Sequence, residues 1–296
     1  MRCGTVLTLA GNGEEGYADG IGAAARFKEP WAIVVDAQGA IFVSNSENNC
    51  LRKWDASNGA VSSLAGDAEE WPGFADWLGS SARFYNPSGM ALDTEGHLIV
   101  ADSSNNCIRK VTTAEGRVTT VAGSGSELSG FADGSALAAR FDSPMSITVD
   151  GSDNILVADQ DNHRIRMIAG KSGRVMTVAG SAERGKEDGT GASARFDQPL
   201  HLTQDERGRL LVLDNVTRGS VRVVEASLAP PQRLAPKVQS VVQDALRMDL
   251  QQAARGHGAG RCDVCGGWTA LPGAPLRAGG AEPLLLRHVR VRQRHA

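Results

Sequence analysis

The stretch that decides the fold begins at Gly123 with G-S-G-S-E-L-S-G-F-A-D-G, continues through A-R-F-D-S-P-M-S-I-T-V-D and N-I-L-V-A-D-Q-D-N-H-R-I-R, and ends at Gly180 with G-R-V-M-T-V-A-G. Its parts recur along the chain. An Ala-Arg-Phe triplet begins at Ala25, Ala82, Ala139 and Ala194, an Ala-Gly pair begins at Ala10, Ala65, Ala122 and Ala179, and a proline follows each triplet at Pro30, Pro87, Pro144 and Pro199. Self-similarity at a long, nearly constant period indicates a repeat architecture.

Each repeat contains four short segments rich in Val and Ile, with turn residues between them. In the third repeat the segments are Ser146–Asp150, Asn154–Ala158, Arg164–Ile168 and Arg174–Ala179. Four strands of this length form one small antiparallel sheet, which buries its faces only by stacking on neighbouring sheets. Radial stacking predicts an all-β protein, a β-propeller of about four four-stranded blades.

A long loop precedes each blade, as between Gly180 and Gln198. Every such loop has an aspartate seven residues before the arginine of the triplet. The pairs are Asp19/Arg26, Asp76/Arg83, Asp133/Arg140 and Asp188/Arg195. We interpret each pair as a structural ion pair inside its loop, with the neighbouring phenylalanine packed under the blade. The alternative is a ring of charges that lines one face.

Two tryptophans distinguish the second loop. Trp71 and Trp77 fall where the first loop has Gly16 and Gly20, so the blade itself does not require aromatic residues there. Exposed Trp is enriched at the centres of protein interfaces. We predict that these two residues contribute to a partner-binding surface on the loop side. The alternative is that they pack within their own loop.

The run D-Q-D-N-H-R-I-R, Asp159–Arg166, resembles the motif of NHL-repeat proteins, with related runs at Asn48–Lys53 and Asn105–Lys110. The V-A-D run that precedes the motif occurs at Val100 and Val157 and is altered at Val43 and Val212. The resemblance covers about residues 5–226. It implies a β-propeller used mostly to bind proteins or RNA, with some enzymatic branches in the family.

The sequence divides into three parts: the predicted propeller at 1–227, a linker with an amphipathic helix at 228–249, and a low-complexity tail at 250–296 that reads as disordered. The segment Thr5–Ala10 reads as a fourth strand without the rest of its blade. The last repeat, 199–226, has three strands. We therefore expect Thr5–Ala10 to pair with Val221–Val224 and close the ring. The alternative is part of a five- or six-bladed ring.

The charge of the chain indicates which kind of partner it binds, and its cysteines indicate where in the cell it is found. Residues 228–296 carry ten basic and four acidic side chains, so the rest of the chain carries 21 basic and 30 acidic ones. An acidic propeller disfavours nucleic acid, which binds a basic face. Of the five cysteines, Cys50 and Cys107 occupy equivalent repeat positions, which indicates buried thiols rather than disulfides. We expect a cytoplasmic protein that neither spans a membrane nor needs a cofactor.

The histidines do not repeat with the blades, since His97, His163 and His201 all align with other residue types. A ring of metal-binding histidines at the propeller axis is therefore not evident. Cys262 and Cys265 form a lone C-x-x-C without a second pair. We predict a non-enzymatic scaffold that binds another protein and holds no metal. The competing class is a propeller enzyme of the lactonase or lyase type with an axial metal.

The composition changes abruptly after Asp249. Back-translation of Leu250–Leu285, shifted by one nucleotide, permits a string that includes D-V-T-F-V-V and F-P-A-H-R-S-V-L-A-A-R-S. That string is similar to the start of a BTB/POZ domain. The resemblance implies an NHL–BTB adaptor that presents bound substrates to a ubiquitin ligase, with the BTB part out of frame in this chain.

Overall fold

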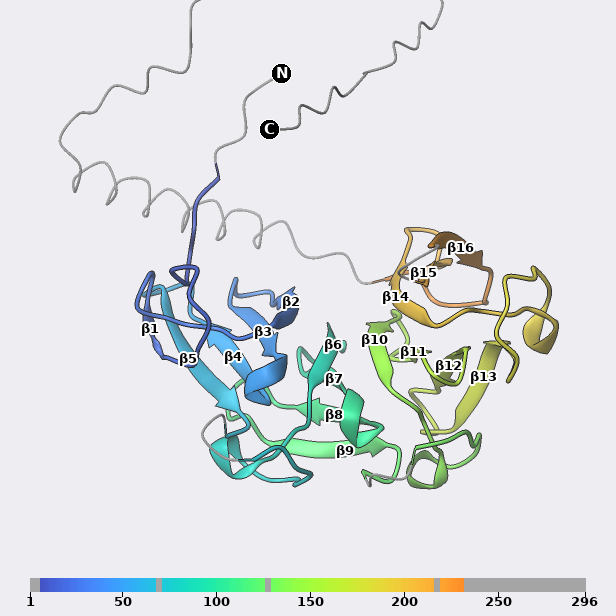
Figure 1. Cartoon of the computed structure of the whole chain (residues 1–296), viewed down its shortest axis with the longest axis horizontal. Coiled ribbons are helices and arrows are strands. Elements are labelled where there is room, and N and C mark those ends of the chain that lie inside the picture. The colour runs from blue at the N-terminus through green and yellow to red at the C-terminus, as the bar shows by residue number, and fades with distance from the viewer. Residues whose placement is uncertain (1–5, 68–70, 126–128, 216–218, 232–296) are drawn as a thin grey trace, which may run out of the picture. The chain divides into compact units, whose positions relative to one another are not determined.

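The computed structural model describes residues 6–67, 71–125, 129–215 and 219–231 (Figure 1). Strands and short 3-10 turns make up the regular structure of these residues, and the strands form four antiparallel sheets. The prediction of an all-β propeller-type fold is confirmed. The predicted helix and tail lie outside the described residues. No helix among the described residues is long and apolar enough to cross a membrane.

Each sheet is one blade, and its strands follow one another in sequence order from the inner to the outer strand. Blade 1 contains β2 (Pro30–Val35), β3 (Ile41–Asn45), β4 (Cys50–Trp54), β5 (Ala60–Ala65) and an added short strand, β1 (Gly20–Ile21). Blade 2 contains β6 (Pro87–Leu92), β7 (Leu98–Asp102), β8 (Cys107–Val111) and β9 (Val118–Ala122). Blade 3 contains β10 (Pro144–Val149), β11 (Ile155–Asp159), β12 (Arg164–Ile168) and β13 (Val175–Gly180). Blade 4 contains β14 (Pro199–Gln204), β15 (Leu210–Asp214) and β16 (Ser220–Val224).

An aspartate at the end of each inner strand forms the first turn of its blade. Asp93 Oδ1 accepts the backbone N–H groups of Glu95, at 3.0 Å, and of His97, at 2.8 Å. Aspartate is favoured in turns because its short side chain satisfies amides that the turn leaves without a backbone partner. The equivalent residues of the other blades, which accept the same two amides, are Asp36, Asp150 and Asp205.

The second turn of blades 1 to 3 requires a left-handed backbone. In blades 1 and 2 it is a 3-10 turn, η1 (Ser46–Asn48) and η3 (Ser103–Asn105). The left-handed residues are Asn49, Asn106 and His163, with φ of 52°, 54° and 55°. Asparagine tolerates this conformation better than most residues. The Asn-His position of the repeat motif is thus a turn position.

The insertion loops contain three more 3-10 turns, η2 (Gly79–Ser81), η4 (Ala136–Ala138) and η5 (Gly191–Ser193). The backbone N–H of the glycine that ends an outer strand reaches the turn of the next loop. Gly66 N donates to Gly79 O at 3.1 Å, and Gly123 N donates to Ala136 O at 3.0 Å. Each loop therefore joins the blade before it to the blade after it.

The core consists of apolar layers between neighbouring blades. The layer between blades 1 and 2 is formed by buried side chains that include Phe42, Leu51, Leu98 and Val100. Equivalent layers join blades 2 and 3 and blades 3 and 4. At the inner edge β6 packs on β10, and a Cβ on Gly89 would lie 2.6 Å from the carbonyl oxygen of Met145. Burial against the neighbouring blade is the main source of stability for sheets this small.

The ring closure predicted from the sequence is wrong for the single chain. Thr5 lies outside the described residues, and β16 pairs with β15 rather than with the described part of Thr5–Ala10. Ala10 instead forms a bridge with Gly22, in the loop before blade 1. The inner strands β2, β6, β10 and β14 pack in series, each on the next, and the first and last blades stand on opposite sides of an opening (Figure 1). Four blades at the spacing set by the apolar layers do not complete the circle.

The segment that follows β16 packs on the turns of blades 3 and 4. Ala229 N donates to Asp150 Oδ2 at 3.1 Å, and Gln204 Nε2 donates to Ala229 O at 2.8 Å. Leu228 packs against the layer between these blades. Residues 228–231, which the sequence assigns to a linker, therefore contact the blades.

We predict that His163→Asn stabilises the fold. Asn106 Oδ1 accepts the amide of Ser143 at 2.9 Å, and Asn49 Oδ1 accepts the amide of Asn86 at 2.9 Å. His163 stands at the same position of blade 3, where asparagine would reach the amide of Gln198. One such hydrogen bond is worth about 1 kcal/mol. Urea unfolding should show a higher free energy of unfolding for His163→Asn and a lower one for His163→Ala. A loss of stability in the asparagine variant contradicts the prediction.

Candidate protein-binding surface

The insertion loops share one backbone arrangement. In each loop the N–H of a glycine donates to the carbonyl of the phenylalanine in the Ala-Arg-Phe triplet. The pairs are Gly16 with Phe27, Gly73 with Phe84, Gly130 with Phe141 and Gly185 with Phe196, at 3.0 to 3.1 Å. Phe84, Phe141 and Phe196 are buried, as the sequence predicts, and Phe27 is partly buried. The loops are thus folded onto their blades.

An arginine from the third strand of each blade, buried in blades 1 to 3 and partly buried in blade 4, holds the loop in place. Arg109 is fully buried. Its Nη1 donates to Asp102 Oδ2 at 2.6 Å and its Nη2 donates to Asp76 Oδ1 at 2.7 Å. The same two nitrogens donate to the carbonyl oxygens of Arg83, at 3.1 Å, and Ala75, at 2.8 Å. One guanidinium therefore joins strand β8, the end of strand β7 and both arms of the loop.

Aromatic rings enclose the same guanidinium. Its Cζ lies 4.7 Å from the ring centroid of Phe74 and 5.1 Å from that of Phe84. Cation–π attraction at such distances contributes about 2 kcal/mol when the cation is desolvated. The corresponding groups in the other blades are Arg52 with Tyr17 and Phe27, Arg166 with Phe131 and Phe141, and Arg222 with Phe196.

The ion pairs predicted within the loops are wrong. Asp19, Asp76, Asp133 and Asp188 pair with the third-strand arginines Arg52, Arg109, Arg166 and Arg222, and not with Arg26, Arg83, Arg140 and Arg195. The reason is the alternation of side chains along an extended backbone. Ala75 forms an antiparallel bridge with Arg83, so Arg83 shares a face with Ala75 and the next residue, Asp76, points to the other face. Arg26 and Arg195 pair with exposed glutamates, Glu14 and Glu183.

The third-strand arginines also recur with a regular spacing in the sequence. Arg52, Arg109, Arg166 and Arg222 are separated by 57, 57 and 56 residues, which matches the period of the repeat. Each follows an apolar residue on a strand that is expected to be buried by the stacking of the blades. A charged residue repeated at a core position requires a fixed counter-ion, because a buried charge without a partner is very costly.

In blades 2 and 3 a carboxyl group lies at the end of the second strand, and burial has the largest effect on its pKa. Desolvation raises the pKa of Asp102 to about 6, and the nearby Arg109 guanidinium opposes the rise. The same causes, burial first and Arg166 against it, raise the pKa of Asp159 to about 6. Asn45 replaces this aspartate in blade 1, so the site accepts a neutral side chain.

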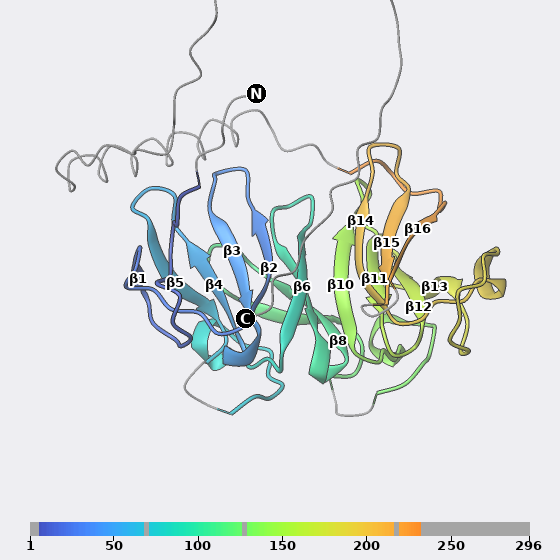
Figure 2. The ribbon, with the colours of Figure 1, turned by 45° about the horizontal axis from the view of Figure 1, so that its top comes forward.

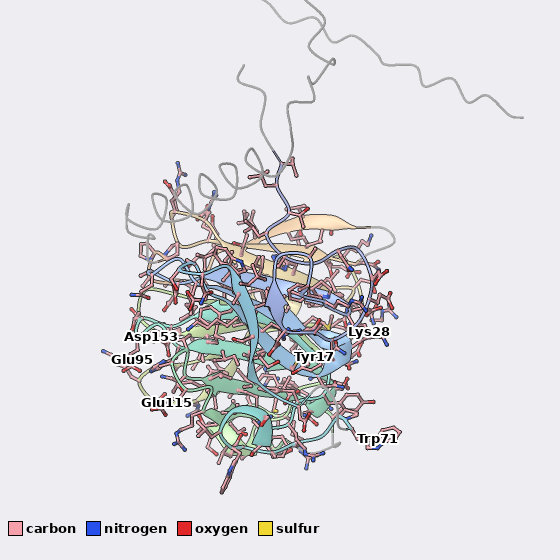
Figure 3. All side chains as sticks on the ribbon, turned by 90° about the vertical axis from the view of Figure 1, so that its left-hand side faces the viewer. Tyr17, Lys28, Trp71, Glu95, Glu115 and Asp153 are labelled. Carbon is pink, nitrogen blue, oxygen red and sulfur yellow. The ribbon has the colours of Figure 1, made fainter. Side chains whose placement is uncertain are left out.

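The two tryptophans are exposed on this loop-side surface. Trp71 is 86% exposed and Trp77 is 66% exposed, and Figure 3 shows Trp71 standing out from the body of the blades. Packing within their own loop is therefore not observed. The predicted equivalence of Trp71 with Gly16 is wrong, because the hydrogen bond to the triplet phenylalanine identifies Gly73 as the counterpart of Gly16. By this register Trp71 takes the place of Glu14.

The backbone of Trp77 is fixed although its side chain is exposed. Trp77 O accepts the amide of Val118, in the outer strand, at 2.7 Å. The next residue, Leu78, forms an antiparallel bridge with Arg117, and Gly79 N donates to Gly116 O at 3.0 Å. An exposed aromatic side chain on a fixed backbone loses little conformational freedom when it binds a partner.

The part of the chain that the structure describes brings no three His, Cys, Asp or Glu side chains together as ligands for a metal ion. His163 occupies a turn, and burial lowers its pKa. His201 Nδ1 lies 3.3 Å from Ser146 Oγ on the neighbouring blade. The geometry thus gives these two histidines structural positions.

The fold and its loop contacts define a protein made of propeller-type blades. The sequence model of the NHL repeat matches residues 27–54 and 84–111, each of which runs from the triplet phenylalanine to the end of the third strand. Two of the four repeats of the chain thus match the NHL repeat. The BTB/POZ resemblance concerns residues outside the described structure.

The chain is similar in sequence to two curated proteins over part of its length. It is 32% identical over 154 residues to NHL repeat-containing protein 2 of Bos taurus, an alignment that covers 49% of this chain and 21% of that protein. It is 24% identical over 275 residues to the Arabidopsis thaliana protein SUPPRESSOR OF QUENCHING 1, chloroplastic, covering 71% of this chain and 26% of that protein. The chain therefore spans about a fifth to a quarter of the length of these curated relatives.

Among solved structures, an auxiliary nutrient binding protein from Bacteroides thetaiotaomicron superimposes with a TM-score of 0.50 at 18% identity. The superposition covers 64% of this chain and 46% of that one. This likeness supports the fold.

We predict that Arg166→Met, in blade 3, lowers the free energy of unfolding by about 3 to 5 kcal/mol, because it leaves Asp159 buried without its counter-ion. The guanidinium of Arg166 donates to Asp159 at 2.6 Å and to Asp133 at 2.7 Å. The control is Arg140→Met, because Arg140 is exposed and does not pair with Asp133. This substitution should lower the free energy of unfolding by less than about 1 kcal/mol. Equal losses in urea unfolding would contradict the assignment.

The stability difference between wild type and Asp102→Asn should depend on pH. In the folded state the pKa of Asp102 is about 6, against an ordinary value of 3.8, so folding favours the protonated form. The free energy of unfolding of the wild type should therefore fall, relative to the variant, by about 2 kcal/mol as pH rises from 4 to 7. Urea unfolding at both pH values measures the change. If the free energy of unfolding of the wild type instead rose relative to the variant as pH rises, the attraction of Arg109 for the Asp102 carboxylate would outweigh the cost of burying it.

Proposed function

We propose that this chain is a non-catalytic scaffold whose loop-side surface binds another protein, with Trp71 and Trp77 as the central contacts. The observation that carries the proposal is that Trp77, exposed to solvent, sits on a backbone held by hydrogen bonds to the outer strand of blade 2. Tryptophan is among the residues most often found at energetic centres of interfaces.

The repeat supplies a comparison that supports a functional role for these side chains. The residue after the loop aspartate is glycine in three loops, Gly20, Gly134 and Gly189, and tryptophan only in the second. The residue at the position of Trp71 is a glutamate, Glu14, in the first loop. Neither aromatic side chain is needed to build a blade.

The chemistry of the surroundings favours a protein partner. Residues 1–227 carry more acidic than basic side chains, which opposes binding to a phosphate backbone. Burial raises the pKa of the Cys50 thiol to about 11 and also raises that of Cys107, so both thiols are unreactive. We propose a cytoplasmic location for the protein, where cysteines stay reduced; Cys50 and Cys107 form no disulfide in the structure.

The first test is Trp71→Ala and Trp77→Ala, singly and together. Proteins captured by the immobilised full chain from an extract of its source cells should be identified, and the affinity of the strongest binder measured for each variant. We expect the double variant to bind at least about tenfold more weakly, as for loss of an interface centre, with its thermal unfolding unchanged.

The matched control is Leu137→Ala, in the blade 3 loop, where an apolar side chain is 64% exposed. It should leave the affinity unchanged. Equal binding by the wild type and the double tryptophan variant would refute the proposed surface. Unfolding of the tryptophan variants would instead make them structural residues.

We also propose that the gene encodes a BTB/POZ domain in another frame after Leu250, so that the intact product acts as a substrate-binding adaptor of a ubiquitin ligase. Support comes from the sequence of Leu250–Leu285 read one nucleotide out of frame. Sequencing the transcript across codons 245–296 should show codons that encode the BTB-like string in the shifted frame. An uninterrupted frame whose codons cannot encode that string would reject the hypothesis.

A further inference from the structure

The outer edge of blade 4 differs from that of the other blades. In blades 1 to 3 the third strand pairs on its outer side with β5, β9 or β13. No strand of the described residues pairs with the outer edge of β16, which lies at the margin of the blades in Figure 2. A groove of about 540 Å³ runs along it, lined by β16, the end of β13 and the loop at 188–196. An unpaired strand edge is a template for another strand.

The groove presents the groups that hold an outer strand elsewhere. In blade 2 the amide of Thr120 donates to Asp76 Oδ2 at 2.9 Å, and in blade 3 the amide of Thr177 donates to Asp133 Oδ2 at 3.1 Å. The equivalent carboxylate of blade 4, Asp188, pairs with Arg222 through Oδ1 and is 97% exposed. Its position is that of an acceptor for an outer strand.

A second set of partners lies in the loop backbone. Gly134 and Val175 exchange two hydrogen bonds, at 3.0 and 2.8 Å, which attach the outer strand of blade 3 to its loop. Gly189 follows Asp188 as Gly134 follows Asp133, and it lines the groove. An incoming strand would therefore find hydrogen-bonding groups on both sides.

A segment near the beginning of the chain matches the outer strands in sequence. Residues 6–11 read V-L-T-L-A-G, and the outer strands read V-S-S-L-A-G at 61–66, V-T-T-V-A-G at 118–123 and V-M-T-V-A-G at 175–180. Gly11 N donates to Gly22 O at 3.0 Å, the contact that Gly66 and Gly123 make with the next loop. The segment thus already lies against blade 1 as the outer strand of a preceding blade would.

Blade 1 leaves open the face that would meet such a blade. An apolar hollow of about 450 Å³ is lined by Leu9, Trp31, Ile33, Val43 and Trp54, among others. Trp31 is 48% and Ile33 is 65% exposed. The equivalents of Ile33 in blades 2 to 4 are Met90, Ile147 and Leu202, all buried against the preceding blade.

Blade 4 leaves open the opposite face. Leu213 is 40% exposed and Val221 is 74% exposed. Their equivalents in blade 3, Ala158 and Ile165, are fully buried in the layer between blades 3 and 4. The two ends of the blade series are therefore complementary halves of an interface that the chain forms three times internally.

We propose that two copies of this chain associate head to tail, with the strand Val6–Ala10 of one copy completing blade 4 of the other. The register of β12 with β13 places Thr8 opposite Arg222 and Leu7 opposite Val223, since Arg166 pairs with Thr177 and Met167 with Met176. The amide of Thr8 then donates to Asp188, and Leu213 and Val221 enter the apolar hollow of blade 1.

A two-fold repetition of this contact closes the assembly. The described residues of each copy form four blades, so a pair of copies forms a ring of eight, within the range of about four to eight blades seen in propellers. Head-to-tail contacts form rings when the rotation closes and filaments when it does not. Ring closure, wrong for one chain, is thus satisfied by two.

The test is a cysteine pair in the full chain. Leu7→Cys with Val223→Cys, in a background where Cys3, Cys262 and Cys265 are serine, should form a disulfide between chains under mild oxidation and yield a covalent dimer. Thr8→Cys with Val223→Cys is the control, because its side chains point to opposite faces of the sheet. The control should stay uncrosslinked.

Sedimentation velocity gives an independent measurement. The wild-type chain should sediment as a dimer that dissociates on dilution, and Thr8→Pro should sediment as a monomer, because proline removes the amide that reaches Asp188. A disulfide within one chain, absence of any crosslink in the Leu7/Val223 pair, or a wild type that is monomeric up to about 100 μM, a weak affinity for a specific contact, would each overturn the proposal.

Discussion

The structure depends on one repeated interaction, a desolvated guanidinium that satisfies carboxylates, backbone carbonyls and aromatic rings at once. Arg109 and Arg166 each bond two carboxylates and two carbonyl oxygens. Arginine suits this position because its planar fork offers five donors in fixed directions, which lysine cannot imitate. Removal of either partner leaves a buried charge, so the group determines how the loop folds on its blade more than it adds net stability.

The architecture could be predicted from the sequence because the same pattern of strands and turns occurs four times. Where all four blades have the same residue, as at Asp93 and its equivalents, the position of that residue and its role in the turn can be inferred from the sequence. Ring closure could not be predicted, since the curvature of the blade series depends on how thick the apolar layers between blades are. Val6–Ala10 has the sequence pattern of an outer strand, but in the structure only Ala10 forms a bridge, with Gly22, and the segment adds to no sheet of the described residues.

The loop ion pairs show a different limit. Asp76 and Arg83 recur together in every loop, yet recurrence in sequence does not reveal which face of an extended segment each side chain occupies. Arg109, with the same period, is the true partner and lies on a strand 33 residues away. Trp71 and Trp77 do not recur in the other loops, and for that reason they could be predicted to be exposed. The position in the first loop that corresponds to Trp71 could be assigned only from the backbone hydrogen bonds of the loops.

Because each guanidinium bridges segments only 33 or 34 residues apart, the contacts that build a blade are local in sequence. Low contact order favours fast folding, and a series of such units behaves as a chain of nearest neighbours in which unfolding starts at the ends. Among the described residues blade 4 has one neighbouring blade, and the side chain of its Asp188 is exposed. Its amide hydrogens therefore exchange with solvent sooner than those of blades 2 and 3, and any partner that covers β16 slows that exchange from the outside inward.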